Sequence, residues 1–411
     1  MKYLSSFHET ATQGYSSAVL RLRTRGTRVP SRLGMTSEIS HATNIINPRK
    51  TVPFLHGRRP NYFGMLAEAM WPLTRISDLK TITVWNSNLA DYSDDGETLY
   101  GAYGPRLMPA VASTVETFLR DPGSRQVVLP IFEPRDVGVK SKDVPCNDMV
   151  MFKIRDFKLN MTVMNRSNDV HLGLYGVNVP QFSMFMQGMM CSLRNINFGD
   201  GERPEFRMGV QTHISDSLHM YLENEQHKPI NLRTHSLSGT VKGFNFYNQD
   251  PFSKMYAPLR IAAPGDGGWI HIENLMRDIS NGFYEGIDHP YVDTSETASM
   301  IIIDMLLTMY AKIKNGVLTR EDALTNFFNT FIEEYEKRFS ANVPAYMTQA
   351  EAVEVFPFDW VAGCLATLYW RNKLAVGSAE PAKQFRLFVE HFDLPKLPFV
   401  WWENYRRFLE A

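Results

Sequence analysis

The sequence predicts an α+β domain with a large sheet, followed by a helical C-terminal extension. Up to about residue 275, apolar helical segments alternate with strand-like runs, and Pro and Gly interrupt the pattern often, as at Asp121-Pro122-Gly123. From about residue 295 the apolar residues recur with the spacing of amphipathic helices instead. We therefore assign residues 1–290 to the α+β domain and residues 291–411 to the extension.

The individual elements follow from the spacing of apolar residues. In the first part, helices are predicted over residues 63–73 and 111–120, and strands over 125–131, 148–155, 159–165 and 227–246. In the extension, helices are predicted over 295–315, 319–339, 359–371 and 381–392. Asn315-Gly316 is typical of a helix end, and Thr319 with Asp322 resembles a capping box. We expect Trp370 and the other aromatic residues of the extension to be packing anchors.

Length and composition bound the class of protein. The chain has 411 residues, 44% of them hydrophobic and 12% aromatic, which is typical of a globular protein with a substantial core. It carries 43 basic against 44 acidic side chains, so its formal charge is −1. Such a balance provides no positive field for polynucleotide phosphate, and we expect no direct nucleic-acid binding.

Cysteine usage and the N-terminus predict a cytoplasmic protein. Cys146, Cys191 and Cys364 lie far apart and form no C-x-x-C motif. The first ten residues lack the apolar core of a secretory signal, and the apolar run 300–303 ends at Asp304, so no membrane span is expected. The histidines show no metal-ligand spacing, and we expect no metal.

Two segments point to covalent chemistry on a phosphorylated substrate. Cys146 lies in Pro145-Cys146-Asn147, and Arg166-Ser167 follows an alternating segment that reads as a strand. A thiol attacks only as thiolate, and a neighbouring guanidinium lowers the pKa of a cysteine. The alternative is that Cys146 is a small buried residue and Arg166 an ion-pair partner, which is the commoner fate of each.

Eight segments, in order over residues 20–275, resemble the thymidylate synthase superfamily, which includes the deoxypyrimidine-nucleotide hydroxymethylases of bacteriophages. They are Gly26-Thr27-Arg28 with Arg32; Ala67-Glu68-Ala69-Met70-Trp71; Val84-Trp85; Tyr100-Gly101-Ala102-Tyr103-Gly104; Asp121-Pro122-Gly123-Ser124-Arg125; Pro145-Cys146; Arg166-Ser167-Asn168-Asp169 with Gly173 and Asn178; and Ser217-Leu218-His219-Met220-Tyr221. The resemblance implies a large mixed sheet with flanking helices. It also implies a catalytic role for the domain.

The resemblance implies the catalytic residues. Cys146 would attack carbon 6 of a pyrimidine, and the enolate formed at carbon 5 would take a one-carbon unit from 5,10-methylenetetrahydrofolate. Glu68 would organise proton transfers, and its place in an apolar helical stretch makes a solvated role less expected. Tyr103 would be the catalytic tyrosine, Asp169 would hold the pterin, and Asn178 would read the pyrimidine edge.

Binding roles follow from the same resemblance. Arg32, Arg125 and Arg166 would hold the nucleotide phosphate with help from Ser167, since guanidinium groups bind phosphate in a bidentate manner. Arg125 would act across a homodimer interface. The sugar 3′-hydroxyl would be held by His219 and Tyr221, and the folate by Trp85, Asp169 and Gly173. By themselves His219, Tyr221 and Asn178 would be read as residues making local hydrogen bonds.

Departures from the synthase pattern predict the branch of chemistry. Asn147 stands where the synthases have His, and Gln126 where they have a second phosphate Arg. Asn168 and the Ser217-Leu218-His219 segment resemble the hydroxymethylases instead, in which water rather than hydride completes the product. An amide at Asn178 suits uracil. The spacing from Gly173 to Asn178 is one residue longer than in the synthases, and this inference fails if Val177 is the true equivalent.

We therefore predict a deoxyuridylate 5-hydroxymethyltransferase that supplies a modified base for a phage genome. Three alternatives stay open: a thymidylate synthase, a deoxycytidylate hydroxymethylase, and a catalytically silent nucleotide-binding homologue. The extension could reinforce a dimer, cover the site or dock a partner.

Overall fold

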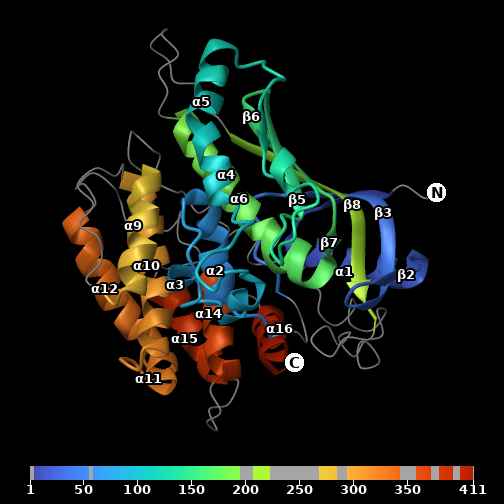
Figure 1. Cartoon of the computed structure of the whole chain (residues 1–411). Coiled ribbons are helices and arrows are strands. Elements are labelled where there is room, and N and C mark those ends of the chain that lie inside the picture. The colour runs from blue at the N-terminus through green and yellow to red at the C-terminus, as the bar shows by residue number, and fades with distance from the viewer. Residues whose placement is uncertain are drawn as a thin grey trace. The chain divides into compact units, whose positions relative to one another are not determined.

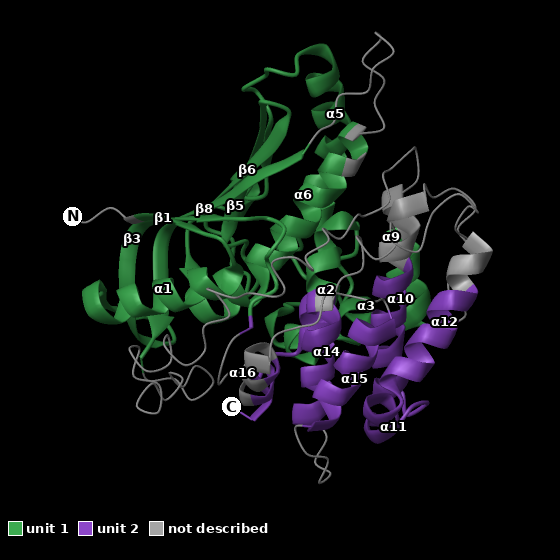
Figure 2. Ribbon diagram, turned by 180° about the vertical axis from the view of Figure 1, so that it is seen from behind, with its two compact units in different colours: residues 1–53, 67–228, 261–281 green, residues 54–66, 229–260, 282–411 purple. Residues whose placement is uncertain are grey.

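The computed structural model describes residues 4–54, 59–194, 207–222, 268–284, 294–342, 358–371, 379–391 and 399–410. The chain divides into two compact units (Figure 2). Unit 1 consists of residues 1–53, 67–228 and 261–281, and unit 2 of residues 54–66, 229–260 and 282–411. The boundary predicted near residue 290 lies outside the described residues and stays a prediction.

Unit 1 is built on one eight-stranded sheet (Figure 1). Its strands are β1 Leu4–His8, β2 Thr27–Ser31, β3 Gly34–Ile46, β4 Val128–Pro130, β5 Asn147–Arg155, β6 Lys158–Asn165, β7 Asn168–Asp169 and β8 Arg207–Tyr221. The order is β1-β3-β8-β6-β5-β4, with β2 paired to β3 and β7 to β8. Parallel and antiparallel pairs both occur, which confirms the predicted mixed sheet.

Several strand predictions agree with the structure and others do not. Strands β5 and β6 begin within one residue of the predicted positions, whereas the strand predicted over 125–131 shortens to β4. The strand predicted over 227–246 lies outside the described residues. The two longest strands, β3 and β8, were not predicted. Buried positions on β8 hold Gln211, His213 and Ser215 instead of apolar residues, so the expected alternation is missing.

Helices cover one face of the sheet, and the other face has residues that are at least partly exposed. Helices α1 (Ala11–Arg25) and α6 (Val179–Arg194) pack on one face, where α1 contacts β3 and α6 contacts β8. On the opposite face one register row crosses six strands and is at least partly exposed throughout; it consists of Phe7, Ile45, Thr212, Thr162, Met151 and Val128. Phe7 is 58% and Val128 is 47% exposed. We call this row the open sheet face.

Two helix predictions in the first part of the chain are confirmed. Helix α2 (Tyr62–Met70) with the 3-10 turn Trp71–Leu73 covers the predicted 63–73, and α5 spans Val111–Arg120 as predicted. Helix α9 (Gly268–Ser280) was not predicted.

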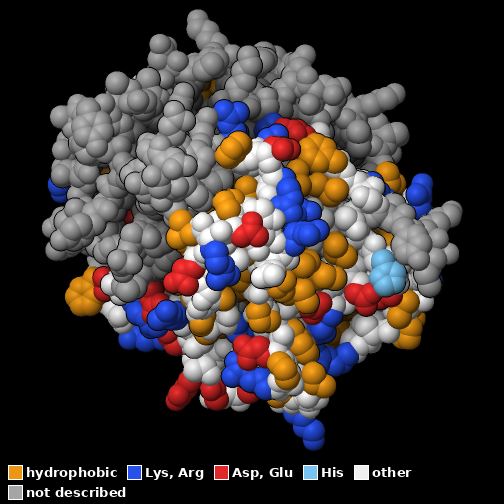
Figure 3. All heavy atoms as spheres, turned by 90° about the horizontal axis from the view of Figure 1, so that it is seen from above, with side chains coloured by type: hydrophobic (Ala, Val, Ile, Leu, Met, Phe, Trp, Pro, Cys, Tyr) orange, Lys and Arg blue, Asp and Glu red, His pale blue; other side chains and the backbone are white. Residues whose placement is uncertain are grey.

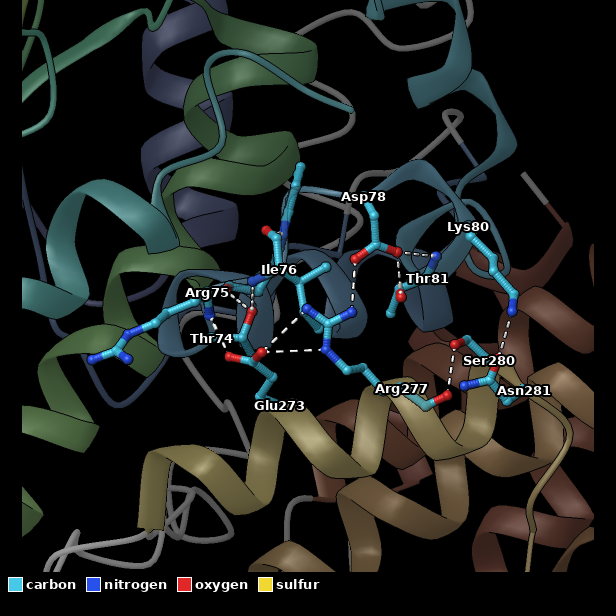
Figure 4. Close-up of polar contacts among 11 residues, drawn as sticks. Thr74, Arg75, Ile76, Asp78, Lys80, Thr81, Glu273, Arg277, Ser280 and Asn281 are labelled. Atoms are coloured by element: carbon cyan, nitrogen blue, oxygen red, sulfur yellow. Dashed lines mark hydrogen bonds and ion pairs between the residues drawn. The ribbon is translucent and has the colours of Figure 1, made fainter. Parts of the chain in front are cut away.

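Polar contacts hold α9 to the segment around the short helix α3 (Leu79–Ile82) (Figure 4). Arg277 Nη1 lies 2.8 Å from Asp78 Oδ2, and Glu273 Oε2 accepts from the Arg75 amide at 2.8 Å. Glu273 and Arg277 lie four positions apart, so their side chains project from the same side of α9. These contacts explain why the chain up to residue 281 belongs to unit 1.

Unit 2 is helical over its described residues, as predicted for the extension. Its helices are α10 Thr294–Lys314, α11 Arg320–Thr325, α12 Phe327–Asn342, α14 Phe358–Arg371, α15 Ala379–His391 and α16 Phe399–Glu410. The predicted helix 319–339 is broken at Asn326. Thr319 caps α11 by accepting from the Asp322 amide, and Gly316 has a φ of 73°. Trp370 packs against Phe408 and donates to Leu409 O, as expected of an anchor.

A buried ion pair supports the loop that leads to Cys146. Arg106 Nη1 lies 2.6 Å from Asp136 Oδ2, and the two side chains are 2% and 0% exposed. The same guanidinium donates to Ile131 O and Tyr100 O. Burial acts to raise the pKa of Asp136, but hydrogen bonds from Arg106, the Glu133 amide and Tyr100 outweigh it and lower the pKa to about 2.

Asp136→Asn is expected to reduce the free energy of unfolding by about 3–5 kcal/mol, because it leaves the Arg106 charge buried without a counter-ion. Since the folded pKa of Asp136 is depressed, the wild-type contribution is present at neutral pH and is lost as the pH falls through about 2. Urea unfolding measures both effects. Arg135→Gln, which breaks an exposed pair with Glu133, is the control and should cost less than about 1 kcal/mol. Equal effects of the two variants would contradict the prediction.

Candidate active site

The structure brings Cys146 and Arg166 together. Strands β5 and β6 pair with Asn147 opposite Asn165, so the residue before β5 and the residue after β6 become neighbours. The Arg166 amide donates to Cys146 O at 3.0 Å, its Nε donates to Pro145 O at 2.9 Å, and its Nη2 lies 3.8 Å from Cys146 Sγ. Cys146 is exposed, and the described partners of Arg166 are carbonyls and this sulfur. Neither residue fits the alternative of a buried thiol and an ion pair.

Competing charges act on the Cys146 thiol. The dense protein around the sulfur raises its pKa, the Arg166 guanidinium opposes that effect, and the Asp143 and Asp148 carboxylates raise the pKa further. The net direction is upward. Arg166 therefore limits the increase instead of making the free thiol strongly acidic.

Asp143 joins the Cys146 loop to the loop that carries Tyr103. The Gly101 amide donates to Asp143 Oδ2 at 2.7 Å. A Cβ at Gly101 would lie 2.3 Å from Asp143 O, so only glycine permits this approach. Burial raises the pKa of Asp143 to about 6. Asp143 thus lies within electrostatic reach of both Cys146 and Tyr103.

Asp143→Asn is expected to lower the pKa of Cys146, because it removes a negative charge while keeping an oxygen to accept from Gly101. The pH dependence of thiol alkylation measures this pKa. The matched control is Asp156→Asn, in the turn at the far end of the β5–β6 hairpin. A Cys146 pKa that stays constant or rises in Asp143→Asn would refute the electrostatic role.

A line of amides continues from the nucleophile into the protein. Asn147 Nδ2 donates to Tyr103 Oη at 2.6 Å, and Asn178 Nδ2 lies 3.5 Å from Asn147 Oδ1 and 3.4 Å from Asn168 Oδ1. The three asparagines are buried. Burial raises the pKa of Tyr103, and the nearby Cys146 adds to the increase. The network fixes Tyr103, Asn147 and Asn178 around one point next to Cys146.

A π-helix from Val170 to Asn178 absorbs the extra residue before Asn178. In a π-helix each backbone hydrogen bond spans five residues, one more than in an α-helix. Asn178 consequently faces Asn147 and is 7% exposed, whereas Val177 is half-buried. At Gly173 a Cβ would lie 2.5 Å from Asn168 Oδ1, so glycine allows the amide line to approach this helix. The Asn178 amide therefore joins the network beside Cys146, and no described polar contact brings Val177 into it.

Asp169 begins the π-helix and keeps one oxygen free. Its Oδ1 accepts from the His171 and Leu172 amides at 2.7 and 2.6 Å, while its buried Oδ2 has no hydrogen-bond partner. An unpaired buried acceptor is costly unless a ligand donates to it. A hydrogen-bond donor on a ligand would satisfy this oxygen. Trp85 is 1% exposed, and the binding role predicted for it stays a prediction.

Glu68 is a buried carboxyl on α2. It is 9% exposed among Leu66, Met70 and other apolar residues of α2, and Asn86 Nδ2 donates to its Oε1 at 2.8 Å. Burial raises the pKa of Glu68 to about 7, although the bond from Asn86 opposes the shift. Such a group exchanges protons near neutral pH.

The sugar-binding candidates lie on β8. His219 pairs with Asp169 of β7, and the His219 and Tyr221 rings meet edge to face with centroids 5.5 Å apart. Burial raises the pKa of Tyr221; Asp169 also raises it, while Arg32 acts in the opposite direction. Arg32, in the turn between β2 and β3, therefore lies within electrostatic reach of this group.

Two predicted phosphate ligands are not brought into this arrangement by described contacts. Arg125 is exposed, Ser167 is half-buried, and neither side chain bonds to another described residue. The sequence analysis missed Asn86 and Asp143, whose roles depend on contacts distant in sequence. Asp143, two residues before Pro145, carried the only sequence signal, as a charge close to the nucleophile.

Among the helices that the structure describes, none combines the length and apolar character that a membrane span requires. Within the same part of the chain, no three His, Cys, Asp or Glu side chains gather as metal ligands would.

Comparison with known proteins agrees with this geometry. A family model for thymidylate synthase matches residues 13–234. Three relatives are described as deoxyuridylate hydroxymethyltransferases: that of Bacillus phage SP01 is 33% identical over 195 residues, that of Pseudomonas phage M6 30% over 222, and that of Delftia phage PhiW-14 28% over 332. The matches cover 43%, 51% and 77% of this chain. They cover 48%, 60% and 85% of the respective relatives, so the first match spans about half of that protein. The family model covers more than half of the chain, which therefore belongs to the thymidylate synthase family.

Proposed function

We propose that this protein is a deoxyuridylate 5-hydroxymethyltransferase that uses 5,10-methylenetetrahydrofolate as co-substrate. The observation that carries the proposal is the placement of the Cys146 thiol 3.8 Å from Arg166, beside the Tyr103–Asn147–Asn178 network, in a thymidylate synthase family chain. The names of the three phage relatives support the hydroxymethyl product.

The protein residues would act in sequence on the nucleotide. The Cys146 thiolate forms a bond to carbon 6, and the electrons of the carbon 5–carbon 6 double bond move toward carbon 5 and oxygen 4. Arg32, Arg125 and Arg166, with Ser167, hold the phosphate; His219 and Tyr221 hold the sugar. When bound, the folate supplies a one-carbon unit to carbon 5. Asp169 Oδ2 would accept from it, and Gly173 and Trp85 are the other residues proposed to bind it.

Glu68 and Tyr103 handle protons in this proposal. A carboxyl with a pKa of about 7 can both give and take a proton at neutral pH. Tyr103 Oη is held by Asn147 at 2.6 Å and directed by it toward the region of Cys146. Carbon 5 must then lose its proton and tetrahydrofolate must leave, which leaves an exocyclic methylene group on the base. The oxygen of water adds to that methylene carbon with loss of a proton, and the thiolate departs from carbon 6, so that the carbon 5–carbon 6 double bond, the hydroxymethyl product and the free enzyme are formed.

Incubation of the purified protein with deoxyuridylate and the folate, followed by mass spectrometry of the nucleotide, tests the proposal. The expected product is 5-hydroxymethyldeoxyuridylate together with tetrahydrofolate. A methyl product with dihydrofolate would assign the protein as a thymidylate synthase. Nucleotide binding without any product would favour the silent homologue.

Asn178→Asp is expected to move the preference from deoxyuridylate to deoxycytidylate. The Asn178 amide can accept from N3–H and donate to oxygen 4 of uracil, whereas cytosine presents the reverse pattern and suits a carboxyl. The Nδ2 contacts of Asn178 at 3.4 and 3.5 Å are long, so the amide can turn to a base. We expect kcat/KM for deoxyuridylate to fall by about 10²-fold or more. Val177→Ala is the control, and a larger effect there would make Val177 the reading position.

We further propose a homodimer in which Arg125 reaches the partner's phosphate site. The exposure of Arg125 and the apolar open sheet face support an interface between copies. Met151→Lys, at the centre of that face, should yield monomers in analytical ultracentrifugation. Arg155→Lys, an exposed position of the same strand, should leave the dimer intact.

A cytoplasmic location, without direct nucleic-acid binding, completes the proposal. The formal charge of −1 supports the absence of direct nucleic-acid binding. On the face shown in Figure 3, described Lys and Arg side chains lie among Asp, Glu and apolar ones and form no continuous basic field.

A further inference from the structure

Strands β3 and β8 carry a line of polar side chains that ends at His219. Glu38 on β3 is the register partner of His219 on β8. The Ser217 hydroxyl donates a short hydrogen bond of 2.6 Å to Glu38 Oε2 and lies 3.5 Å from His219 Nδ1. We call these three side chains the Glu38 relay.

The relay determines which nitrogen of His219 carries the proton. A serine hydroxyl has a single proton, and in Ser217 that proton is directed to Glu38. The Ser217 oxygen can therefore only accept from His219. For Ser217 and the neutral imidazole to hydrogen-bond, Nδ1 has to be the donor, which leaves Nε2 as an acceptor.

The contact between Ser217 and His219 is long, but the surrounding groups restrict the movement of both side chains and keep them within reach of each other. Hydrogen bonds of this kind are often long in a site without ligand and tighten when the ligand binds. His219 is 8% exposed and is flanked by the Tyr221 ring, so its movement is confined. Glu38 and Ser217 are fixed by paired strands.

We infer that the Glu38 relay holds His219 as a hydrogen-bond acceptor and thereby selects a nucleotide whose sugar presents a donor at its 3′ position. This inference rests on the proposed function, because it takes a deoxynucleotide as the ligand. A 3′-hydroxyl satisfies Nε2, whereas a 3′-hydrogen or a 3′-fluorine leaves that acceptor desolvated and unpaired. Glu38 and Ser217 act through His219 and are positioning residues.

The tautomer of His219 tests the relay in the protein without nucleotide. ¹⁵N chemical shifts of the imidazole at high pH should show the proton on Nδ1 of His219. In Glu38→Gln the amide can donate to Ser217, whose proton then turns toward His219, so the Nε2–H tautomer should increase. An Nε2–H tautomer in the wild-type protein would overturn the relay.

Binding of a nucleotide pair tests the consequence for specificity. Deoxyuridylate should bind the wild-type protein about tenfold more tightly than 2′,3′-dideoxyuridine 5′-monophosphate does. In Ser217→Ala this ratio should fall to about twofold, mainly through weaker deoxyuridylate binding. If Ser217 had only a structural role, Ser217→Ala would weaken the binding of both nucleotides and leave the ratio of their affinities unchanged. Ser40→Ala, at the exposed register partner of Ser217, is the control and should keep the wild-type ratio.

The outcomes separate this inference from the proposed function. An unchanged ratio in Ser217→Ala overturns the inference, while the product assay still decides the function. If deoxyuridylate does not bind the wild-type protein at all, the proposed function fails and the 3′ selection fails with it. The free-protein tautomer then still decides whether Glu38 and Ser217 control His219.

Discussion

Cys146→Ala is expected to lower turnover of deoxyuridylate by about 10⁴-fold or more, because no other described group can supply the covalent bond to carbon 6. Cys364, the other cysteine whose side chain the structure describes, is fully buried in unit 2. Burial raises its pKa well above the ordinary value, so it is a poor substitute nucleophile. The loss should appear in kcat, since Arg166 and the amide network remain to hold the nucleotide.

Mass spectrometry of the intact protein supplies the decisive measurement. The wild-type protein incubated with a 5-fluorinated deoxyuridylate and the folate should gain the mass of a covalent adduct, and Cys146→Ala should not. Cys364→Ala is the control and should retain the adduct. Persistence of turnover in Cys146→Ala would show that Cys146 is not the nucleophile and that the protein acts by a different mechanism.

Glu68→Gln is expected to lower kcat by about 10²–10⁴-fold, the range that a positioned acid or base contributes. The amide keeps the oxygen that accepts from Asn86 but cannot exchange a proton. The wild-type pH–rate profile should contain a transition near pH 7 that disappears in the variant. Glu116→Gln, on the exposed side of α5, should leave rate and profile unchanged.

The same substitution is expected to stabilise the fold at alkaline pH. The pKa of Glu68 rises from 4.5 to about 7 on folding, so its favourable contribution is complete below about pH 4.5 and is lost as the pH rises through about 7. At pH 8 the variant should be more stable by an amount on the order of 2–3 kcal/mol, and the difference should shrink toward zero near pH 4.5. Denaturant unfolding at the two pH values tests the sign.

The fold could be predicted where apolar spacing was regular. Helices such as Val111–Arg120 and strands β5 and β6 follow that spacing and were predicted closely. Strands β3 and β8 were not, because their covered positions hold Asn44, Gln211, His213 and Ser215. Tertiary burial of polar groups overrides the pattern on which such predictions rest.

The site could be predicted only as far as neighbours in sequence allowed. Cys146 and Arg166 were expected to meet, and strand pairing brings them to 3.8 Å. The hydrogen bonds from Asn86 to Glu68 and from Gly101 to Asp143 join segments that are distant in sequence, and no local sequence pattern predicts such contacts. Trp85, expected at the folate site, is enclosed by the protein, and its place at that site stays a prediction.

The π-helix before α6 confines an insertion to a single turn. One added residue in a regular α-helix would rotate everything after it by about 100°. Gln181 on α6, which donates to Glu68 O at 3.0 Å, would then point elsewhere, and so would the Phe182 ring that stacks on Tyr103. Because the extra residue is accommodated in the π-helix, the chain is one residue longer before Asn178, while Gln181 and Phe182 on α6 keep their orientation. Deletion of one residue from this turn is therefore expected to change the position of Asn178, and with it the preference between uracil and cytosine, more than it changes the rest of the protein.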